Sequence, residues 1–561
     1  MRKLLLLAST LLIFAPLQAQ SSFVPINSDY EHLIDRFEIK SGRIFPKMHT
    51  QLKPFSRKVI AEMADSVWSG LTSLSIADRF NLDYLKNDSW EWSTTAENDS
   101  KKPILKHLYR KKSDFYQFQN NDFDLHINPI LHGFVGYDRD NDETPFMNTR
   151  GVELRGMIAR KLGFYTYFTD TQATFPAYVV GQINQLNAVP NEGYFKRNIG
   201  NDGVDFLTAR GYITFDVIKN IVNLQFGYDK NFVGHGYRSM ILSDFSSNYL
   251  FLKLNTHVWR INYQNIFGQL TADVFNADGF FPQKYFALHH LSINITKNFN
   301  LGLFESIVFN RGDSSAVGNR SGSFDLRYLN PLIFYRSIEQ QAGSPDNAVL
   351  GMDFKWNLWK KLSLYGQLVI DEFVLSEIRD WNGWRGNKQS GQLGLKYVDV
   401  AGVDNLDLQT EVNIARPYMY SHNFQYGEFS NYNQALAHPL GANFYEFIGM
   451  MRYQPYKRLN LSGKMIYADY GTDPEGQNWG QNIFLDNSTF EQEYGNRIGQ
   501  GIETKLLFLD LTATWQIRHN MFVDLKQIYR KLNSTQDNLD KTTVYFAFVF
   551  RWNVPQRLYE F

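Results

Sequence analysis

Aromatic and arginine side chains gather in three polar segments of the chain, at 372–388, 415–442 and 471–502. Aromatic rings stack on flat ligand faces and planar guanidinium groups bond hydroxyl or acidic groups, so this mixture is typical of a site that holds a sugar polymer. A second interpretation stays open, in which the same rings pack the segments onto one another. The residues concerned are Trp381, Trp384 and Arg385 in the first segment, Arg416, Tyr418, Tyr420, His422 and His438 in the second, and Trp479 in the third.

Two further segments carry charged groups close to glycine. The sequence GHGYR at 234–238 combines a flexible backbone with His235 and Arg238. We expect a structural loop that forms a constriction, with a grip by Arg238 on a carboxylate or phosphate as the alternative. The stretch from Arg320 to Asn347, which includes Arg336, predicts an inward-folded polar network.

Few residues have the types and spacing that a catalytic site requires. His289 and His290 stand beside Ser292 on one predicted strand, but neighbouring strand residues point to opposite faces, so the two imidazoles cannot act together. The chain has no cysteine, which excludes thiolate ligands for a metal. We therefore expect a protein that is not an enzyme and has neither cofactor nor metal. Four carboxylates could imitate a glycosidase pair but are better explained as polar wall residues: Glu305, Asp371, Glu372 and Glu411.

The elements that position these side chains are strands. In LDLQTEVNI at 406–414, alternate residues are apolar and polar, which predicts Leu406, Leu408, Val412 and Ile414 on a lipid-facing side and Asp407, Gln409, Glu411 and Asn413 inside. The same period recurs often enough for about eighteen strands. They are expected at 123–136, 150–160, 163–171, 207–216, 221–228, 248–256, 259–270, 285–296, 299–309, 349–358, 361–371, 389–398, 405–414, 443–454, 458–470, 503–517, 521–531 and 542–552.

Short and long connections between these strands alternate strictly, as periplasmic turns and outer loops do in an antiparallel transmembrane β-barrel. The predicted fold is thus an all-β transmembrane barrel of about eighteen antiparallel strands at 122–561. The long segments named above then face outward. We expect the bacterial outer membrane as the location and its lipid as a partner.

The residues before the barrel divide into three parts. A positive start, a short apolar run and a small-residue cleavage site make 1–19 a signal peptide. Residues 20–92 carry three amphipathic helical patterns, with capping boxes predicted at Ser28 and Ser75, and should form a small periplasmic helical bundle that closes the barrel from below. Residues 93–121 are a polar connector. Because Lys plus Arg and Asp plus Glu both number 57, a nucleic-acid partner is not expected.

Several longer motifs make the chain resemble the Wzi-like capsule-assembly family: FEIKSGRIFPKMHTQLKPFSRK, TRGVELRG, DKNFVGHGYRSMILSD, YLNPLIFYRSIEQQAGSPDNAVLG and RPYMYSH with LAHPLGANF. It is most similar to the gliding-motility branch of the RemB type. The resemblance implies an eighteen-stranded outer-membrane barrel with a periplasmic helical bundle, and a lectin-like role toward capsular polysaccharide. The expected function is to organise or retain surface polysaccharide, with a contribution to gliding; the alternatives are a diffusion channel of the porin kind and a scaffold for motility or secretion partners.

Overall fold

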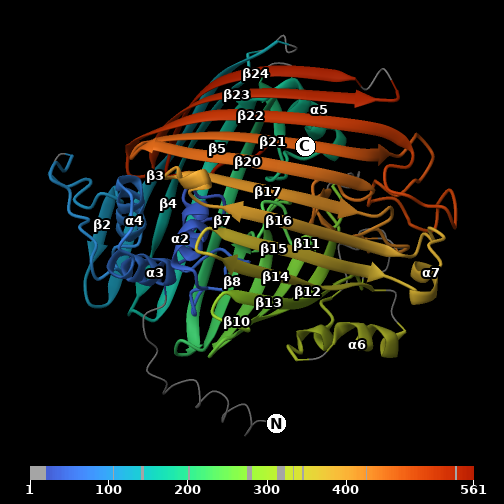
Figure 1. Ribbon diagram of the computed structural model, residues 1–561, viewed down its shortest axis with the longest axis horizontal. Helices are drawn as coiled ribbons and strands as arrows, with labels where there is room; N and C mark the ends of the chain where they lie inside the picture. Colours follow the sequence, from blue (N-terminus) through green and yellow to red (C-terminus); the bar gives the residue numbers. More distant parts are fainter. Residues whose placement is uncertain are drawn as a thin grey trace, which may run out of the picture.

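Eighteen antiparallel strands close into one barrel in the computed structural model (Figure 1). The structure describes residues 21–104, 106–139, 144–199, 202–274, 281–311, 323–332, 334–343, 346–424, 426–536 and 540–561, so the predicted signal peptide at 1–19 lies outside the described residues. The strands pair in chain order and β24 pairs with β3, which closes the ring. They are β3 (Phe123–Asp138), β4 (Phe146–Ile158), β5 (Leu162–Thr174), β7 (Gly203–Ile218), β8 (Val222–Asp229), β10 (Tyr249–Val258), β11 (Ile261–Thr271), β12 (Gln283–Asn294), β13 (Phe299–Phe309), β14 (Asn347–Leu358), β15 (Leu362–Glu372), β16 (Lys388–Tyr397), β17 (Leu406–Ala415), β20 (Phe444–Tyr456), β21 (Leu459–Thr472), β22 (Ile502–Arg518), β23 (Met521–Ser534) and β24 (Lys541–Trp552).

Each predicted strand is present at its predicted place, and the alternation that predicted them is visible in the burial of the side chains. On β17, Glu411 and Asn413 are buried inside the barrel while Val412 between them is 40% exposed on the outside. Other strands likewise place large apolar side chains outward, such as Leu393 and Leu511. An apolar exterior around a polar interior is the pattern of a barrel that stands in a bilayer.

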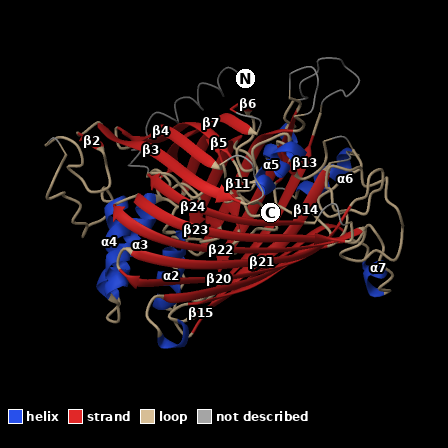
Figure 2. Cartoon of the chain, turned by 90° about the horizontal axis from the view of Figure 1, so that it is seen from above, coloured by secondary structure: helices blue, strands red, loops and turns tan. Residues whose placement is uncertain are grey.

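The two ends of the barrel differ (Figures 1 and 2). One end has short turns, and exposed Trp259 and Trp359 lie in two of them, where indole rings suit a membrane interface. The other end has long loops. These contain α5 (Ala177–Leu186), β6 (Lys196–Ile199), β9 (Phe232–Val233), η1 (Leu326–Leu329), α6 (Tyr335–Ala342), α7 (Leu375–Arg379), β18 (Ser430–Asn431) and β19 (Gln434–Ala435), whereas η2 (Val400–Gly402) lies in a turn at the opposite end.

The three predicted N-terminal helices form and pack together at the short-turn end: α2 (Glu31–Ser41), α3 (Arg57–Gly70) and α4 (Ile76–Asp88). The capping box of Ser75 with Asp78 is confirmed. The predicted cap at Ser28 is wrong, because Tyr30 holds the N-cap position and the Ser28 hydroxyl donates instead to the Pro25 carbonyl. In the described part of the chain no helix is long and apolar enough to cross a membrane.

Two short strands modify the predicted division of the chain. β1 (Leu52–Lys53), within the helical segment, pairs with β9 from a long loop. β2 (Tyr116–Gln119), within the predicted connector, pairs with β3 and so extends the barrel wall. The connector is therefore partly sheet, because YQFQ alternates in the same way as the true strands.

Candidate functional site

Three long loops at the outer end pack into one layer, here called the loop layer: residues 373–387, 416–443 and 473–501. The backbone N–H of Arg385 donates to the Glu493 carbonyl at 3.0 Å, and that of Tyr418 donates to the Gly480 carbonyl at 2.8 Å. Backbone bonds between loops fix their relative positions, since each one would otherwise have to be replaced by water. The side chains that the layer presents are therefore held in place.

Trp384 and Arg385 form a fixed aromatic and cationic pair in this layer. Glu493 accepts from the Trp384 indole nitrogen at 2.7 Å and from Arg385 Nε at 3.3 Å. The Arg385 guanidinium also lies 3.9 Å from the ring centre of Phe490. Both residues remain partly exposed. An oriented indole beside a planar cation suits a sugar ring that bears an acidic group.

Two more tryptophans are accessible on the layer. Trp381, at the end of α7, is 91% exposed. Trp479 is partly exposed, and its indole nitrogen donates to Gln477 at 2.9 Å. The structure thus brings Trp384 and Arg385 together and leaves Trp381 and Trp479 at separate points of the same surface. Arg416 links the first two loops, because its guanidinium donates to the Trp384 carbonyl at 3.5 Å.

The structure does not place Tyr418, Tyr420 and His438 at the surface, so their assignment as ligand-binding groups needs correction. Tyr418 and Tyr420 are each 1% exposed, and His438 is 0% exposed. Tyr420 donates its hydroxyl to the Met240 carbonyl at 2.7 Å, and His438 bonds Glu446 at 2.7 Å. These three side chains hold the loops together. The apolar run LAHPL at 436–440 was a sequence signal for the burial of His438.

The loop at 230–248, here called the inner loop, descends into the lumen. The Gln51 carbonyl accepts from the Gly234 N–H at 2.8 Å, beside the β1–β9 pairing. A Cβ on Gly236 would lie 2.5 Å from Gln392 Oε1 and 2.6 Å from Glu411 Oε2, so a larger residue would have to displace these two wall side chains. The two glycines of GHGYR therefore serve a close contact with the wall.

The predicted constriction residues lie inside the barrel. His235 is 4% exposed, and its carbonyl accepts from the Lys396 ammonium at 2.7 Å. The Arg238 guanidinium lies 3.5 Å from Glu446 and donates to the Glu560 carbonyl at 2.7 Å. Since Arg238 already has protein partners for its charge, it is not poised for an anionic ligand.

Residues 553–561, here called the tail, turn back into the lumen after β24. Glu560 pairs with Lys464 and accepts from the Tyr237 hydroxyl, so it joins the barrel wall to the inner loop. Phe561 is buried against Tyr178 of α5. Nothing in the strand pattern predicted this position, because the tail has no periodicity of its own.

Ion pairs fasten the helices to the barrel wall. Asp35 lies 2.9 Å from Lys355 and 2.5 Å from Lys396, and Arg36 lies 2.6 Å from Asp399 and 2.5 Å from Asp407. Burial by itself raises the pKa of Asp35, but the two ammonium groups outweigh it and hold that pKa far below its ordinary value. Helix α2, the inner loop and the tail therefore occupy the lumen.

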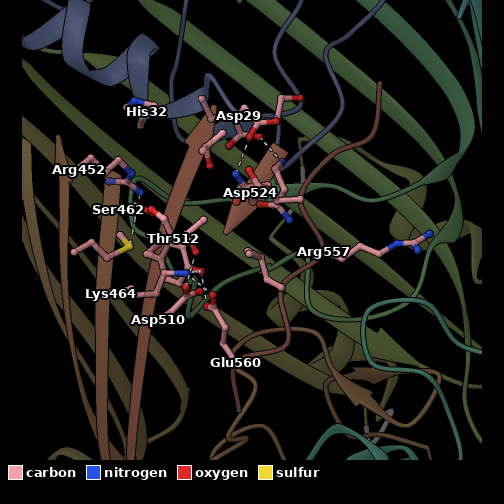
Figure 3. A pocket seen from close by; sticks show the side chains of 18 of the residues that line it. Asp29, His32, Arg452, Ser462, Lys464, Asp510, Thr512, Asp524, Arg557 and Glu560 are labelled. Atoms are coloured by element: carbon pink, nitrogen blue, oxygen red, sulfur yellow. Dashed lines mark hydrogen bonds and ion pairs between the residues drawn. The ribbon is translucent and has the colours of Figure 1, made fainter. Parts of the chain in front are cut away.

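A cavity of about 350 Å³ remains between α2, the tail and the strands β20 to β24 (Figure 3). Ion pairs lie along its wall: Lys464 meets Glu560, and Lys526 lies 2.9 Å from Asp510. Arg551 lies 2.7 Å from Asp524. Paired charges of this kind provide neither a free nucleophile nor a free base.

The other groups that could have served catalysis are separated. His290 faces the lumen and bonds Asp353, whereas His289 faces outward and bonds Glu305 at 3.1 Å, as predicted from strand geometry. Asp371 accepts from the Tyr420 N–H at 3.0 Å. Within the described ranges, no three His, Cys, Asp or Glu residues are grouped in a way that could hold a metal ion.

Comparison with solved structures agrees with this architecture. The chain aligns with Wzi of Escherichia coli, an outer membrane protein involved in group 1 capsule assembly and described as a carbohydrate binding β-barrel, with a TM-score of 0.57 and 13% identity over 96% of this chain and 100% of that chain. The two proteins share a fold. A closed barrel with an apolar exterior and this likeness make the chain an outer-membrane β-barrel.

Weaker likenesses extend to other solved structures. OprD of Pseudomonas aeruginosa aligns with a TM-score of 0.41 and 10% identity over 76% of this chain and 94% of that chain. OccAB4 of Acinetobacter baumannii aligns with a TM-score of 0.40 and 9% identity over 77% of this chain and 98% of that chain. A family-model scan and a search of curated proteins gave no match.

Proposed function

We propose that this protein is a non-enzymatic, non-conducting outer-membrane barrel that retains a surface polysaccharide on its loop layer. The observation that carries the proposal is the filled lumen: α2, the inner loop and the tail occupy it and are bonded to its wall, while α3 and α4 pack at the short-turn end. A barrel filled in this way leaves its outer loops as the surface open to partners.

The loop layer supplies the chemistry. Trp381, Trp384 and Trp479 offer indole faces, and Arg385 offers a planar cation that is held beside Trp384 by Glu493. Wzi, which shares the fold, is described as carbohydrate binding, which supports a carbohydrate-binding role for this barrel. The carboxylates inside the barrel are engaged in ion pairs and hydrogen bonds, which supports a binding role rather than hydrolysis.

A binding measurement tests the proposal. The detergent-solubilised barrel and polysaccharide isolated from the same cells would be compared with a variant in which Trp381, Trp384 and Trp479 are all alanine. Each lost stacking contact should weaken binding by about 0.5–1.5 kcal/mol. The control replaces Trp259 and Trp359, which are also exposed but lie at the opposite end.

Unchanged affinity of the triple variant, or equal losses in the control, would contradict the proposal. A null result with intact protein would favour the scaffold alternative, in which the loop layer binds motility or secretion partners. A contribution of the polysaccharide-retaining barrel to gliding rests on the sequence resemblance alone.

A diffusion channel is the second candidate function. The cavity of about 350 Å³ favours it, because charged groups from α2, the tail and β20 to β24 line a space inside the barrel. Conduction would require the helices or the inner loop to move, so the two candidates differ in whether the intact chain carries current.

A further inference from the structure

Residues 323–332 and 334–343, here called the flap, cover part of the barrel's outer surface. Ring and carboxylate contacts fix this position: the flap's Tyr335 stacks on His289 with ring centres 4.3 Å apart, and His289 faces outward because its neighbour His290 faces the lumen. Figure 1 shows α6 alongside the barrel. The predicted inward-folded polar network at 320–347 is therefore wrong for the residues of the flap.

The flap reaches down beside the membrane-spanning strands. Glu305 on β13 accepts from the N–H groups of Tyr335 at 2.8 Å and Arg336 at 2.8 Å. Glu305 lies four residues before Phe309, where β13 ends, which is roughly 13 Å along a strand at about 3.4 Å per residue. The Tyr263 hydroxyl of β11 also donates to the Pro331 carbonyl. The flap thus lies against the barrel's outer wall, below the ends of the strands.

The flap has two apolar faces. Tyr328, Tyr335 and Ile338 are buried against β11 to β13. On the opposite face, Leu326 is 74%, Leu332 83% and Phe334 75% exposed. Large apolar side chains left this exposed within one short segment mark a contact with another apolar phase or partner.

Two cations flank this exposed face. Arg327 and Arg336 are both more than half exposed, and they pair with Asp325 and Glu339 on the flap itself. The carboxylates are only 11% and 13% exposed, but each guanidinium has five N–H donors and reaches solvent, so it can keep its partner and also donate to a phosphate oxygen.

We propose that the flap is a lipid-binding site, with the acyl chains of an anionic lipid against Leu326, Leu332 and Phe334 and its headgroup phosphate bound by Arg327 and Arg336. Lipid is the occupant because the patch is continuous with the barrel's lipid-facing wall, where Leu303 and Leu350 are also exposed. Basic groups beside an apolar face are the pattern of an element that lies in a membrane interface.

The arrangement also explains the polar pair beneath the flap. Without it, Glu305 and His289 would face lipid, where charged groups cost several kcal/mol. The flap removes this cost. Tyr335 covers His289, and two N–H groups in the first turn of α6 donate to the Glu305 carboxylate.

Fluorescence quenching tests the proposal. The chain has no cysteine, so Leu332→Cys carries a single environment-sensitive label, and Ser488→Cys on the loop layer serves as the control. The proteins would be reconstituted in phosphatidylcholine vesicles whose acyl chains are brominated. We expect loss of most of the fluorescence at position 332, little loss at 488, and the reverse order with aqueous iodide.

The headgroup contact has its own measurement. Native mass spectrometry in mixed phosphatidylcholine and phosphatidylglycerol should show anionic lipid retained by the original protein and lost from the Arg327→Gln, Arg336→Gln variant. Equal iodide quenching at 332 and 488 would overturn the proposal, as would protection of position 332 by a co-purified protein in place of lipid. Unchanged lipid retention in the arginine variant would refute the phosphate contact.

Discussion

Replacement of Glu411 should free the inner loop from the barrel wall. The Glu411 carboxylate accepts from the N–H groups of Tyr237 at 2.7 Å and Arg238 at 3.0 Å, and from the Tyr365 hydroxyl at 2.8 Å. A hydrogen bond to a charged group contributes about 1.5–3 kcal/mol. The two backbone bonds together therefore stabilise the docked loop by about 3–6 kcal/mol. Glu411→Ala removes both, and Glu411→Gln keeps one acceptor oxygen and should lose part of the effect.

Hydrogen exchange of the amides at 230–248 measures this loss directly. Each 1.4 kcal/mol is a factor of ten, so protection should fall by roughly 10² to 10⁴ in Glu411→Ala. The control is Gln409→Ala, two residues away on the same strand, which loses a bond to Tyr365 and none to the loop. If Glu411→Ala leaves the loop as protected as the original while the barrel stays folded, the loop is not held by this carboxylate.

Two further outcomes follow from the architecture. Val412→Arg places a charge on the lipid face and should destabilise the barrel in vesicles by about 2–4 kcal/mol in urea titrations, whereas Val412→Leu should not; equal stability would show that this face does not meet lipid. Burial, with the nearby guanidinium groups of Arg452 and Arg36, lowers the pKa of His32 to about 3. Because this folded-state pKa lies below the unfolded value of about 6.5, the docking of α2 should be fully stable above pH about 6.5 and weaken as the pH falls toward 3. Amide protection factors of α2 measured from pH 7 to 4 should fall, and His32→Gln should flatten that profile; an unaltered profile would exclude His32 as the cause.

The barrel was predictable from sequence because the alternation that identifies each strand lies within that strand. Alternation such as that of Glu411, Val412 and Asn413 indicates which face of the strand meets lipid. The regular alternation of short and long connections indicates which end of the barrel has turns and which has long loops. The Ser75 cap was predictable for the same reason, since it depends on residues three apart. These signals are local and need no knowledge of the rest of the chain.

The positions of the loops in the folded protein could not be predicted from such local signals. Tyr420 is buried because the Met240 carbonyl, 180 residues away, accepts its hydroxyl, and Phe561 is buried by α5. The flap has an amphipathic pattern, but that pattern does not say whether its apolar side meets the inside or the outside of a barrel. A polar residue that lines the lumen also looks like one in a solvated loop, so Arg238 could be placed inside only as a hypothesis.

Conductance in planar bilayers tests most directly the claim that the lumen is closed and the protein acts through its outer surface. The intact protein should show no steady current, because helices, inner loop and tail are bonded to the wall. A variant lacking residues 20–92 should open a measurable ion path, since it loses both the α2 ion pairs of Asp35 and Arg36 and the strand β1 that pairs with β9 of the inner loop. A large steady conductance from the intact protein would contradict the account and favour a diffusion channel.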